Sequence, residues 1–162
     1  MAKTVAEVMT PTPITIQIAA SLQAAIQLLA EHRISGLPVV EADGTLCGVL
    51  SESDLMWQAT GAPLPAYIML LDSVIYLKNP NRYSQELHKA LGQTVREVMS
   101  DRKVVTTTPT TSMRDAAQIM HNQKVRRLPV VDDSGQLKGI LTQGDIVREM
   151  ALSYPQAVAV TP

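Results

Sequence analysis

Two stretches of the 162-residue chain place a hydroxyl three residues before an aspartate, directly after a run of apolar residues. The first carries Ser51 and Asp54, and the second carries Thr142 and Asp145. A hydroxyl at a strand end can donate to a phosphate oxygen, and the first amides of a following helix favour an anion. A carboxylate there can accept from both hydroxyls of a ribose. The alternative is that these residues only cap helices, as their types often do.

Basic residues gather near the second stretch: Arg102, Lys103, Lys124, Arg126 and Arg127. The corresponding part of the first half holds only Arg33. Adjacent arginines at the start of a strand suit phosphate because each guanidinium can make two parallel hydrogen bonds. We therefore predict phosphate binding in the second half, the alternative being a solvated basic surface. Ile34 and Val125, which precede the Leu-Pro-Val strands, could sandwich a flat base.

The sequence contains no recognisable catalytic arrangement. It lacks a Ser-His-Asp order, a paired carboxylate motif, a Walker glycine loop and Gly-x-Gly-x-x-Gly. Cys47 is the single cysteine, which excludes a disulfide framework, and we expect it to be packed in a strand. The three histidines are too scattered to suggest a metal site. We expect neither an enzyme nor a metal-binding protein.

These stretches belong to two copies of an internal repeat. Residues 5–10 recur as 95–100, residues 37–40 as 128–131, and residues 48–54 as 139–145. Each copy predicts the order β-α-β-β-α, so the fold class is α+β. Ser21 is the expected cap of a helix that buries Leu22, Ala25, Ile26 and Leu29, and Thr111 or Ser112 caps the matching helix with Met113, Ala116, Ala117 and Met120.

The repeats divide the chain into four parts. Residues 5–57 form the first repeat, 58–94 an insert, 95–149 the second repeat and 150–162 a tail. The insert combines an apolar stretch over 66–77 with a predicted helix over 84–91, so we expect a helical connector. The alternative is that its apolar face binds a partner or a second copy of the chain.

Composition limits the class of protein. Hydrophobic residues make up 46% of the chain and the net charge is −1, which argues against disorder and against a general nucleic-acid binder. Residues 1–81 carry three basic and seven acidic groups, whereas residues 82–162 carry eleven basic and eight acidic groups. No secretory signal or membrane-spanning stretch is visible, so we expect a soluble, cytoplasmic protein.

Three repeated motifs resemble those of the cystathionine-β-synthase (CBS) domain. They are the Val-x-x-Val-Met-Thr/Ser opening, the Leu-Pro-Val-Val strand and the Gly-Val/Ile-Leu-Ser/Thr-x-x-Asp block. Two copies resemble a CBS pair, or Bateman module, of the stand-alone type found in bacteria and chloroplasts. The resemblance implies two units packed with pseudo-twofold symmetry, often as a dimer. It also implies clefts between the repeats that bind AMP, ADP or ATP, or less often S-adenosylmethionine or NAD.

The resemblance also implies roles for residues. Ser51 or Thr142 would contact phosphate, and Asp54 or Asp145 would hold the ribose. The other implied contacts are Ile34, Ser35, Pro38 and Ser53 in the first repeat, Val125, Arg126, Arg127 and Pro129 in the second, and Thr10, Arg102 and Lys103 in the openings. Gly36 lacks the basic group of Arg127, which makes the first repeat the weaker phosphate site. The second repeat departs from the family pattern at Gly144, which lacks the hydroxyl of Ser53.

The expected function is that of a non-enzymatic sensor. Nucleotide binding would change the packing of the module and signal to a partner in trans, such as an enzyme or a transporter, with the module itself a homodimer. The alternative is a ligand-free interaction or dimerisation module. An enzyme is the least favoured interpretation.

Overall fold

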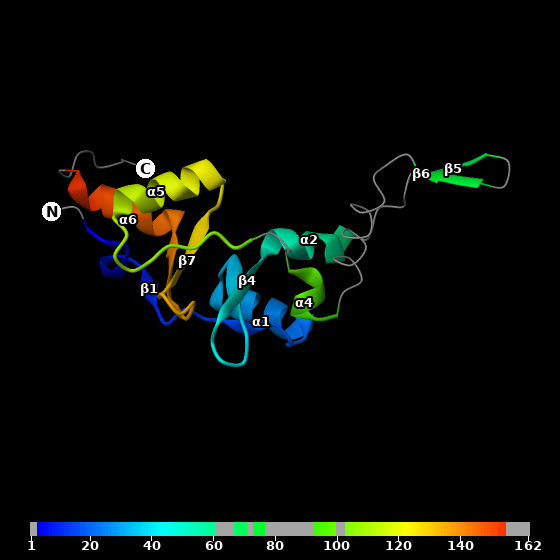
Figure 1. The fold of residues 1–162 in the computed structure, drawn as a ribbon, viewed down its shortest axis with the longest axis horizontal. Helices are drawn as coiled ribbons and strands as arrows, with labels where there is room; N and C mark the ends of the chain where they lie inside the picture. Colours follow the sequence, from blue (N-terminus) through cyan, green and yellow to red (C-terminus); the bar gives the residue numbers. More distant parts are fainter. Residues whose placement is uncertain (1–2, 61–66, 71–72, 77–92, 100–102, 155–162) are drawn as a thin grey trace, which may run out of the picture. The chain divides into compact units, whose positions relative to one another are not determined.

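The computed structural model describes residues 3–60, 67–70, 73–76, 93–99 and 103–154. The first repeat contains β2 (Ile16–Gln17), α1 (Leu22–His32), β3 (Gly36–Val40), β4 (Leu46–Ser51) and α2 (Glu52–Thr60). The second contains α5 (Met113–Gln123), β7 (Arg127–Val131), β8 (Leu137–Thr142) and α6 (Gln143–Ser153). Thr107 takes the place of β2 there, with one parallel bridge to Val130. The predicted β-α-β-β-α order is complete in the first repeat (Figure 1), whereas in the second an isolated bridge stands in place of the first strand.

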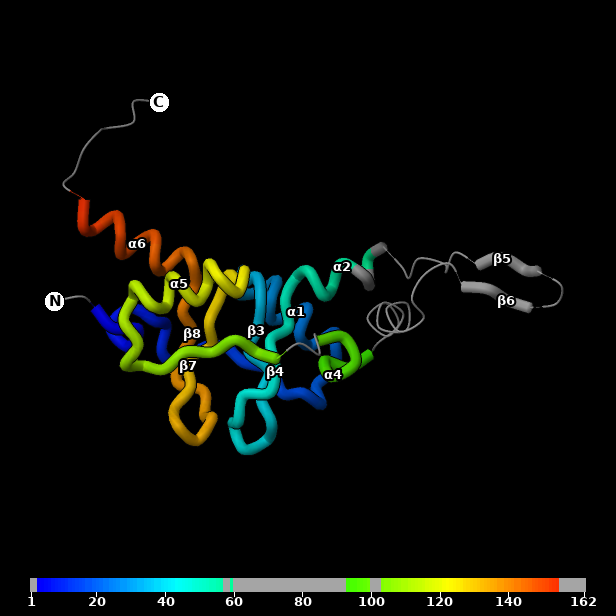
Figure 2. The backbone as a smooth tube through the Cα atoms, turned by 45° about the horizontal axis from the view of Figure 1, so that its top comes forward, coloured from blue at the N-terminus to red at the C-terminus, as the bar shows by residue number. Residues whose placement is uncertain are grey.

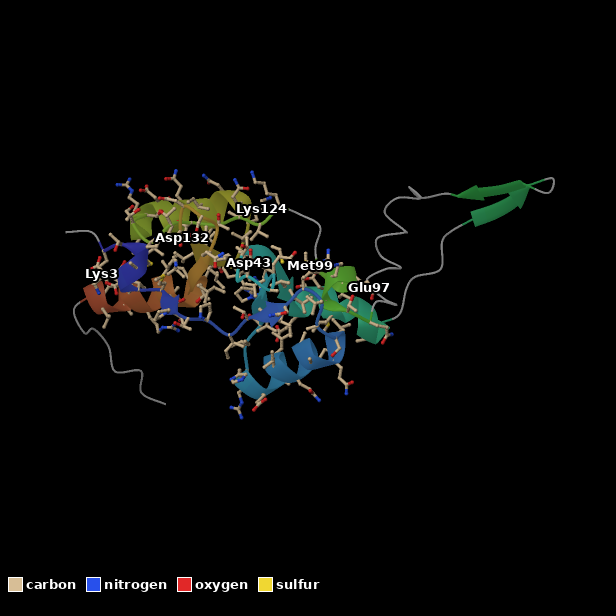
Figure 3. The ribbon with its side chains drawn as sticks, turned by 60° about the horizontal axis from the view of Figure 1, so that its bottom comes forward. Lys3, Asp43, Glu97, Met99, Lys124 and Asp132 are labelled. Atoms are coloured by element: carbon tan, nitrogen blue, oxygen red, sulfur yellow. The ribbon has the colours of Figure 1, made fainter. Side chains whose placement is uncertain are left out.

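Each repeat is preceded by a short opening. The first opening holds the 3-10 helix η1 (Val5–Glu7) and strand β1 (Thr10–Pro11), and the second holds α4 (Val95–Val98). Both begin with a threonine and carry a glutamate three residues later, which together form a capping box. Glu97, labelled in Figure 3, accepts from the amides of Gln93 and Thr94 at 2.7 and 3.0 Å.

Two three-stranded sheets confirm the α+β class. Their strand orders are β2-β3-β4 and β1-β8-β7. β2 runs parallel to β3, with Ile16 opposite Val39, whereas β1 and β7 both run antiparallel to β8. Figure 2 shows the turn that joins β7 to β8. Arg127 lies opposite Thr142 in that hairpin, so the start of β7 is beside the end of β8.

The compact units do not follow the order of the repeats along the chain. One unit comprises residues 1–13, 44–46 and 104–162, and the other comprises residues 14–43 and 47–103. The amide of Val5 donates to the carbonyl of Thr111 at 2.8 Å, and the amide of Val95 donates to the carbonyl of Ala20 at 3.0 Å. Each opening is therefore part of the unit that contains the body of the other repeat.

Each unit has its own apolar core. The unit around the first repeat buries Ile16, Ile18, Leu22, Ala25, Leu29, Leu37, Val39, Leu50, Val95 and Val98. The other buries Val5, Ala116, Met120, Leu128, Val130 and Leu141, and α5 packs against α6 within it (Figure 1). The prediction for Ile26 is wrong: its side chain is 42% exposed, because it lies at the edge of the α1 face that Leu22, Ala25 and Leu29 bury.

The expected helix starts are correct. The Ser21 hydroxyl accepts from the amide of Ala24 at 3.2 Å, and the Ser112 hydroxyl accepts from the amide of Asp115 at 3.1 Å. Both helices end in a left-handed residue, Arg33 with φ 51° and Lys124 with φ 54°. Because the two chain reversals match, both repeats enter their Leu-Pro-Val strands in the same way.

The insert is not wholly helical, which corrects the prediction for residues 58–94. β5 (Tyr67–Leu70) and β6 (Ser73–Tyr76) pair antiparallel, with Tyr67 opposite Tyr76. A short apolar run has no periodicity that separates a strand from a helix, and its β-branched and aromatic residues favour the strand. Helix α2 continues to Thr60, and the predicted helix over 84–91 lies outside the described residues. None of the helices described is long and apolar enough to cross a bilayer.

Candidate functional site

In the first repeat, the end of β4 and the start of α2 form a closed hydrogen-bonded turn. The Oδ2 atom of Asp54 accepts from the Ser51 amide at 3.0 Å and from the Ser51 hydroxyl at 2.9 Å. Asp54 is only 8% exposed although it is charged. A buried carboxylate needs such donors, because an ionised group that loses water without gaining hydrogen bonds costs more than the roughly 2–7 kcal/mol of a neutral amide or hydroxyl. The strand end therefore fixes the position of the carboxylate.

The second repeat builds the same turn where β8 meets α6. The Oδ2 atom of Asp145 accepts from the amide and the hydroxyl of Thr142, both at 2.7 Å. The Thr142 hydroxyl in turn accepts from the Asp145 amide at 3.3 Å, which completes a helix cap. Asp145 is 7% exposed. The capping role that the sequence allowed is thus observed in the second repeat.

A cap of this kind also positions groups that could bind a ligand. The hydroxyl lies among the first amides of a helix, where an anion is favoured. A carboxylate oxygen that already accepts hydrogen bonds keeps its partner oxygen oriented for a further donor. Capping and ligand binding are therefore compatible uses of the same pair of residues.

The segment before each Leu-Pro-Val strand reaches the same helix start. The amide of Glu52 donates to the carbonyl of Ser35 at 3.2 Å, and the amide of Gln143 donates to the carbonyl of Arg126 at 3.0 Å. The Gln143 side chain also donates to the carbonyl of Val125 at 3.3 Å. These bonds bring the residues predicted for base and phosphate to the hydroxyl–carboxylate turn in both repeats.

The side chains of that segment differ in exposure. Ile34 and Val125 are half-buried against the cores of their units. Ser35 and Arg126 are exposed, and Arg127 is half-buried. Pro38 and Pro129 are fully buried, so in this structure both serve as core residues of β3 and β7. Lys124, labelled in Figure 3, is exposed at the end of α5.

The remaining predicted residues lie in the openings and in α2. Thr10 is exposed in β1, opposite Ile140 of β8, and so belongs to the unit of Thr142 and Asp145. Lys103 is exposed and belongs to the other unit. Arg102 lies outside the described residues, and Ser53 is exposed in the first turn of α2.

Contacts with the openings leave little room for a larger side chain at two positions of the repeated motif, Gly48 and Gly139. A Cβ built on Gly48 would lie 2.9 Å from Cε of Met99, and a Cβ on Gly139 would lie 2.9 Å from the carbonyl oxygen of Thr10 and closer still to Sδ of Met9. Each Val-Met-Thr/Ser opening therefore packs its methionine on the Gly-Val/Ile-Leu strand of the other repeat. This contact holds Thr10 in its place on β8.

Sequence reasoning did not single out Arg148. Its guanidinium Nη2 donates to Oδ1 of Asp145 and forms an ion pair across one turn of α6. The available signal was the Asp-x-x-Arg spacing, which puts opposite charges on one helix face. In the first repeat, Trp57 occupies the equivalent position.

Two other titratable groups lie apart from these turns. Partial burial raises the pKa of the Cys47 thiol in β4, which donates to the carbonyl of Val39 in β3 at 3.3 Å. Ser134 and Lys138 hold the pKa of Asp132 far below its usual range. Among the described residues, no group of three His, Cys, Asp or Glu side chains could hold a metal ion.

Comparison with known proteins identifies one family. The sequence pattern of the CBS domain matches twice, over residues 5–59 and 95–152. An uncharacterized protein of Methanocaldococcus jannaschii is 37% identical over 133 residues, which cover 77% of this chain and 78% of that protein. The chloroplastic CBS domain-containing protein CBSX2 of Arabidopsis thaliana is 34% identical over 149 residues, which cover 90% of this chain but only 62% of that protein.

Solved structures give the same result. The crystal structure of CBSX2 in complex with AMP has a TM-score of 0.77 at 31% identity, and covers 93% of this chain and 97% of that one. The CBS domain pair of protein MJ0100, in complex with 5-methylthioadenosine and S-adenosyl-L-methionine, has a TM-score of 0.70 at 23% identity. It covers 95% of this chain and 100% of that pair, and supports the fold.

Proposed function

Because this chain belongs to the CBS domain family and carries two copies of the domain, we propose that it is a non-enzymatic regulatory module that binds AMP, ADP or ATP. The observation that carries the proposal is the recurrence of one arrangement: a buried aspartate held by the hydroxyl and amide of a strand-end residue. The AMP complex of CBSX2 supports an adenosine ligand. S-adenosylmethionine is the less favoured alternative.

The second repeat is the proposed phosphate site. Arg126 and Arg127 flank the turn of Thr142 and Asp145 there, whereas Ser35 and Gly36 occupy the equivalent positions of the first repeat. Thr142 would turn its hydroxyl proton from Oδ2 of Asp145 to the phosphate, and Asp145, still held by the Thr142 amide, would accept from the ribose hydroxyls. Half-buried Val125 would contact the base. In the first repeat Ser51, Asp54 and Ile34 would take these roles, with Lys103 as the basic group.

Regulation follows if the nucleotide binds one arrangement of the units more tightly than another, because binding then shifts the population toward that arrangement. The change would be transmitted to a separate enzyme or transporter that the module regulates. The cytoplasmic location expected from the sequence is also part of this proposal. A dimerisation role is the second candidate. It is favoured by exposed Val147 and Met150, which lie three residues apart on one face of α6, and by exposed Tyr154 directly after the helix.

Calorimetric titration of the whole chain with AMP, ATP and S-adenosylmethionine tests the proposal. We expect Asp145→Ala to weaken AMP at least about tenfold, since a hydrogen bond to a charged group contributes about 1.5–3 kcal/mol. Asp115→Ala is the matched control, because Asp115 also accepts from a cap hydroxyl, Ser112, at 2.7 Å but is exposed at the start of α5. Absence of binding, or equal losses in both variants, would refute the proposal.

A further inference from the structure

Arg148 is a charged residue near the start of α6 to which the proposed function gives no role. It lies three residues after Asp145, on the same face of the helix, and its guanidinium pairs with Oδ1 of that carboxylate. The Arg148 side chain is 73% exposed, whereas that of Asp145 is 8% exposed. The pair therefore joins a buried acceptor to a cation that still faces solvent.

The guanidinium also lies over the first turn of α6. A Cβ built on Gly144 would be 3.5 Å from Nη1 of Arg148 and 3.6 Å from Oγ1 of Thr142. The space beside the Thr142 hydroxyl, where a side chain at position 144 would begin, is thus bordered by the guanidinium. The same helix start supplies backbone amides that favour an anion.

The two repeats differ in a coordinated way at these positions. The first repeat has Ser53 and Trp57 where the second has Gly144 and Arg148. Ser53 supplies a hydroxyl in the first turn but is followed by no cation, whereas Gly144 supplies none and lies beneath a cation. The second repeat thus exchanges a neutral donor for a charged one at the same end of the helix.

We propose that Arg148 is a specificity residue that contacts the phosphate group of a nucleotide in the second repeat and favours phosphorylated adenosine ligands over adenosine. This inference rests on the proposed function. Before a nucleotide binds, the ion pair with Asp145 holds the Arg148 guanidinium beside Thr142, so the Arg148 side chain is already close to the proposed phosphate position. When the ribose hydroxyls donate to Asp145, the guanidinium turns from the carboxylate to the phosphate, which accepts two hydrogen bonds from its planar fork.

The mechanism predicts an effect that depends on phosphate. Arg148→Gln removes the charge and keeps part of the stem, so AMP should bind about tenfold more weakly. Adenosine has no phosphate, and its affinity should change less than about twofold, because the Arg148 side chain is 73% exposed and water screens its charge at Asp145. A purely structural role for Arg148 would instead weaken both ligands together.

The experiment compares AMP and adenosine by calorimetry in chains that carry Asp54→Ala, so that the second repeat is the site measured. Lys3→Gln is the matched control, because it also removes one positive charge from the same unit. Lys3 is exposed and pairs with the Glu149 carboxylate of α6 at 2.8 Å, so its loss likewise breaks one ion pair. We expect this control to leave both affinities unchanged. If Arg148→Gln does not fold, Arg148→Lys keeps the charge without the planar fork and should show an intermediate loss of AMP affinity.

The outcomes separate this inference from the proposed function. If the unaltered chain binds neither AMP nor adenosine, the proposed function fails and this inference with it. If the chain with Asp54→Ala binds AMP but Arg148→Gln changes AMP and adenosine by equal factors, only the role of Arg148 is overturned. The role is also overturned if Asp54→Ala alone abolishes AMP binding, because the ligand then occupies the first repeat.

Discussion

The packing of methionines on Gly48 and Gly139 allows a sharp comparison of two matched substitutions. Gly139→Ala would put a Cβ 2.9 Å from the carbonyl oxygen of Thr10, in the strand β1 that pairs with β8. Gly48→Ala would overlap with the flexible end of Met99, at 2.9 Å from Cε and 3.0 Å from Sδ, and would otherwise make an ordinary contact with Cβ of Val39 at 3.7 Å. A side-chain end can rotate away, whereas a paired backbone must shift.

The expected magnitudes follow from that difference. Overpacking costs about 1–3 kcal/mol, and replacing glycine by alanine returns about 0.4–1 kcal/mol through the unfolded chain. For Gly139→Ala we expect a net loss of about 1–2 kcal/mol in the free energy of unfolding. For Gly48→Ala we expect a change below about 0.5 kcal/mol, because rotation of Met99 relieves the overlap.

Urea unfolding followed by circular dichroism measures both values. Double variants separate the contacts: Met99→Ala should remove the remaining cost of Gly48→Ala, whereas Met9→Ala should recover only part of the cost of Gly139→Ala. Equal losses in the two single variants would refute the reasoning. So would complete recovery by Met9→Ala, because the contact with the Thr10 carbonyl would then carry no cost.

Two further predictions concern single side chains. Thr107→Val should raise the free energy of unfolding by about 1 kcal/mol, because the buried Thr107 hydroxyl has no hydrogen-bond partner among the residues that the structure describes, and the backbone bonds to Pro129 and Val131 do not need it. A loss of stability in urea unfolding would contradict this. Asp132→Asn should make the free energy of unfolding decrease less as the pH is lowered into the acid range. The pKa of Asp132 is lowered in the folded chain, first by the Ser134 hydroxyl and then by Lys138, so its contribution is present above the ordinary pKa of about 4 and is lost as pH falls. Unfolding midpoints measured between pH about 5 and 2 should fall less steeply in the variant, and parallel profiles would contradict the assignment.

Much of the site could be predicted because its parts are close in sequence. Ser51 and Asp54, like Thr142 and Asp145, are three residues apart at a strand–helix junction, and the hydrogen bonds between them follow from that spacing. The repeat supplied an internal control, since the same pattern occurs twice. The helix caps at Ser21 and Ser112 were predictable for the same local reason.

Other features needed information that no local pattern contains. The sequence predicts a helical insert where the structure has the hairpin of β5 and β6, because short apolar runs carry no period that separates a strand from a helix. Ile26 fits the helical spacing but is exposed, since the width of the buried face depends on what packs against α1. The spacing of Asp145 and Arg148 predicts an ion pair, but the approach of the guanidinium to the space at Gly144 depends on the side-chain conformation that the structure shows.

The sequence by itself determined the two repeats, the α+β elements within each and the hydroxyl–carboxylate pair at the start of α2 and α6. Only the tertiary structure decided which opening completes which repeat. Val5 and Met9 pack with the second repeat, and Val95 and Met99 with the first. The physical reason is that the openings bind through backbone hydrogen bonds and methionine–glycine contacts between residues far apart in the chain. Because both repeats carry the same Val-Met and Gly motifs, either pairing satisfies the local pattern, and the fold selects one.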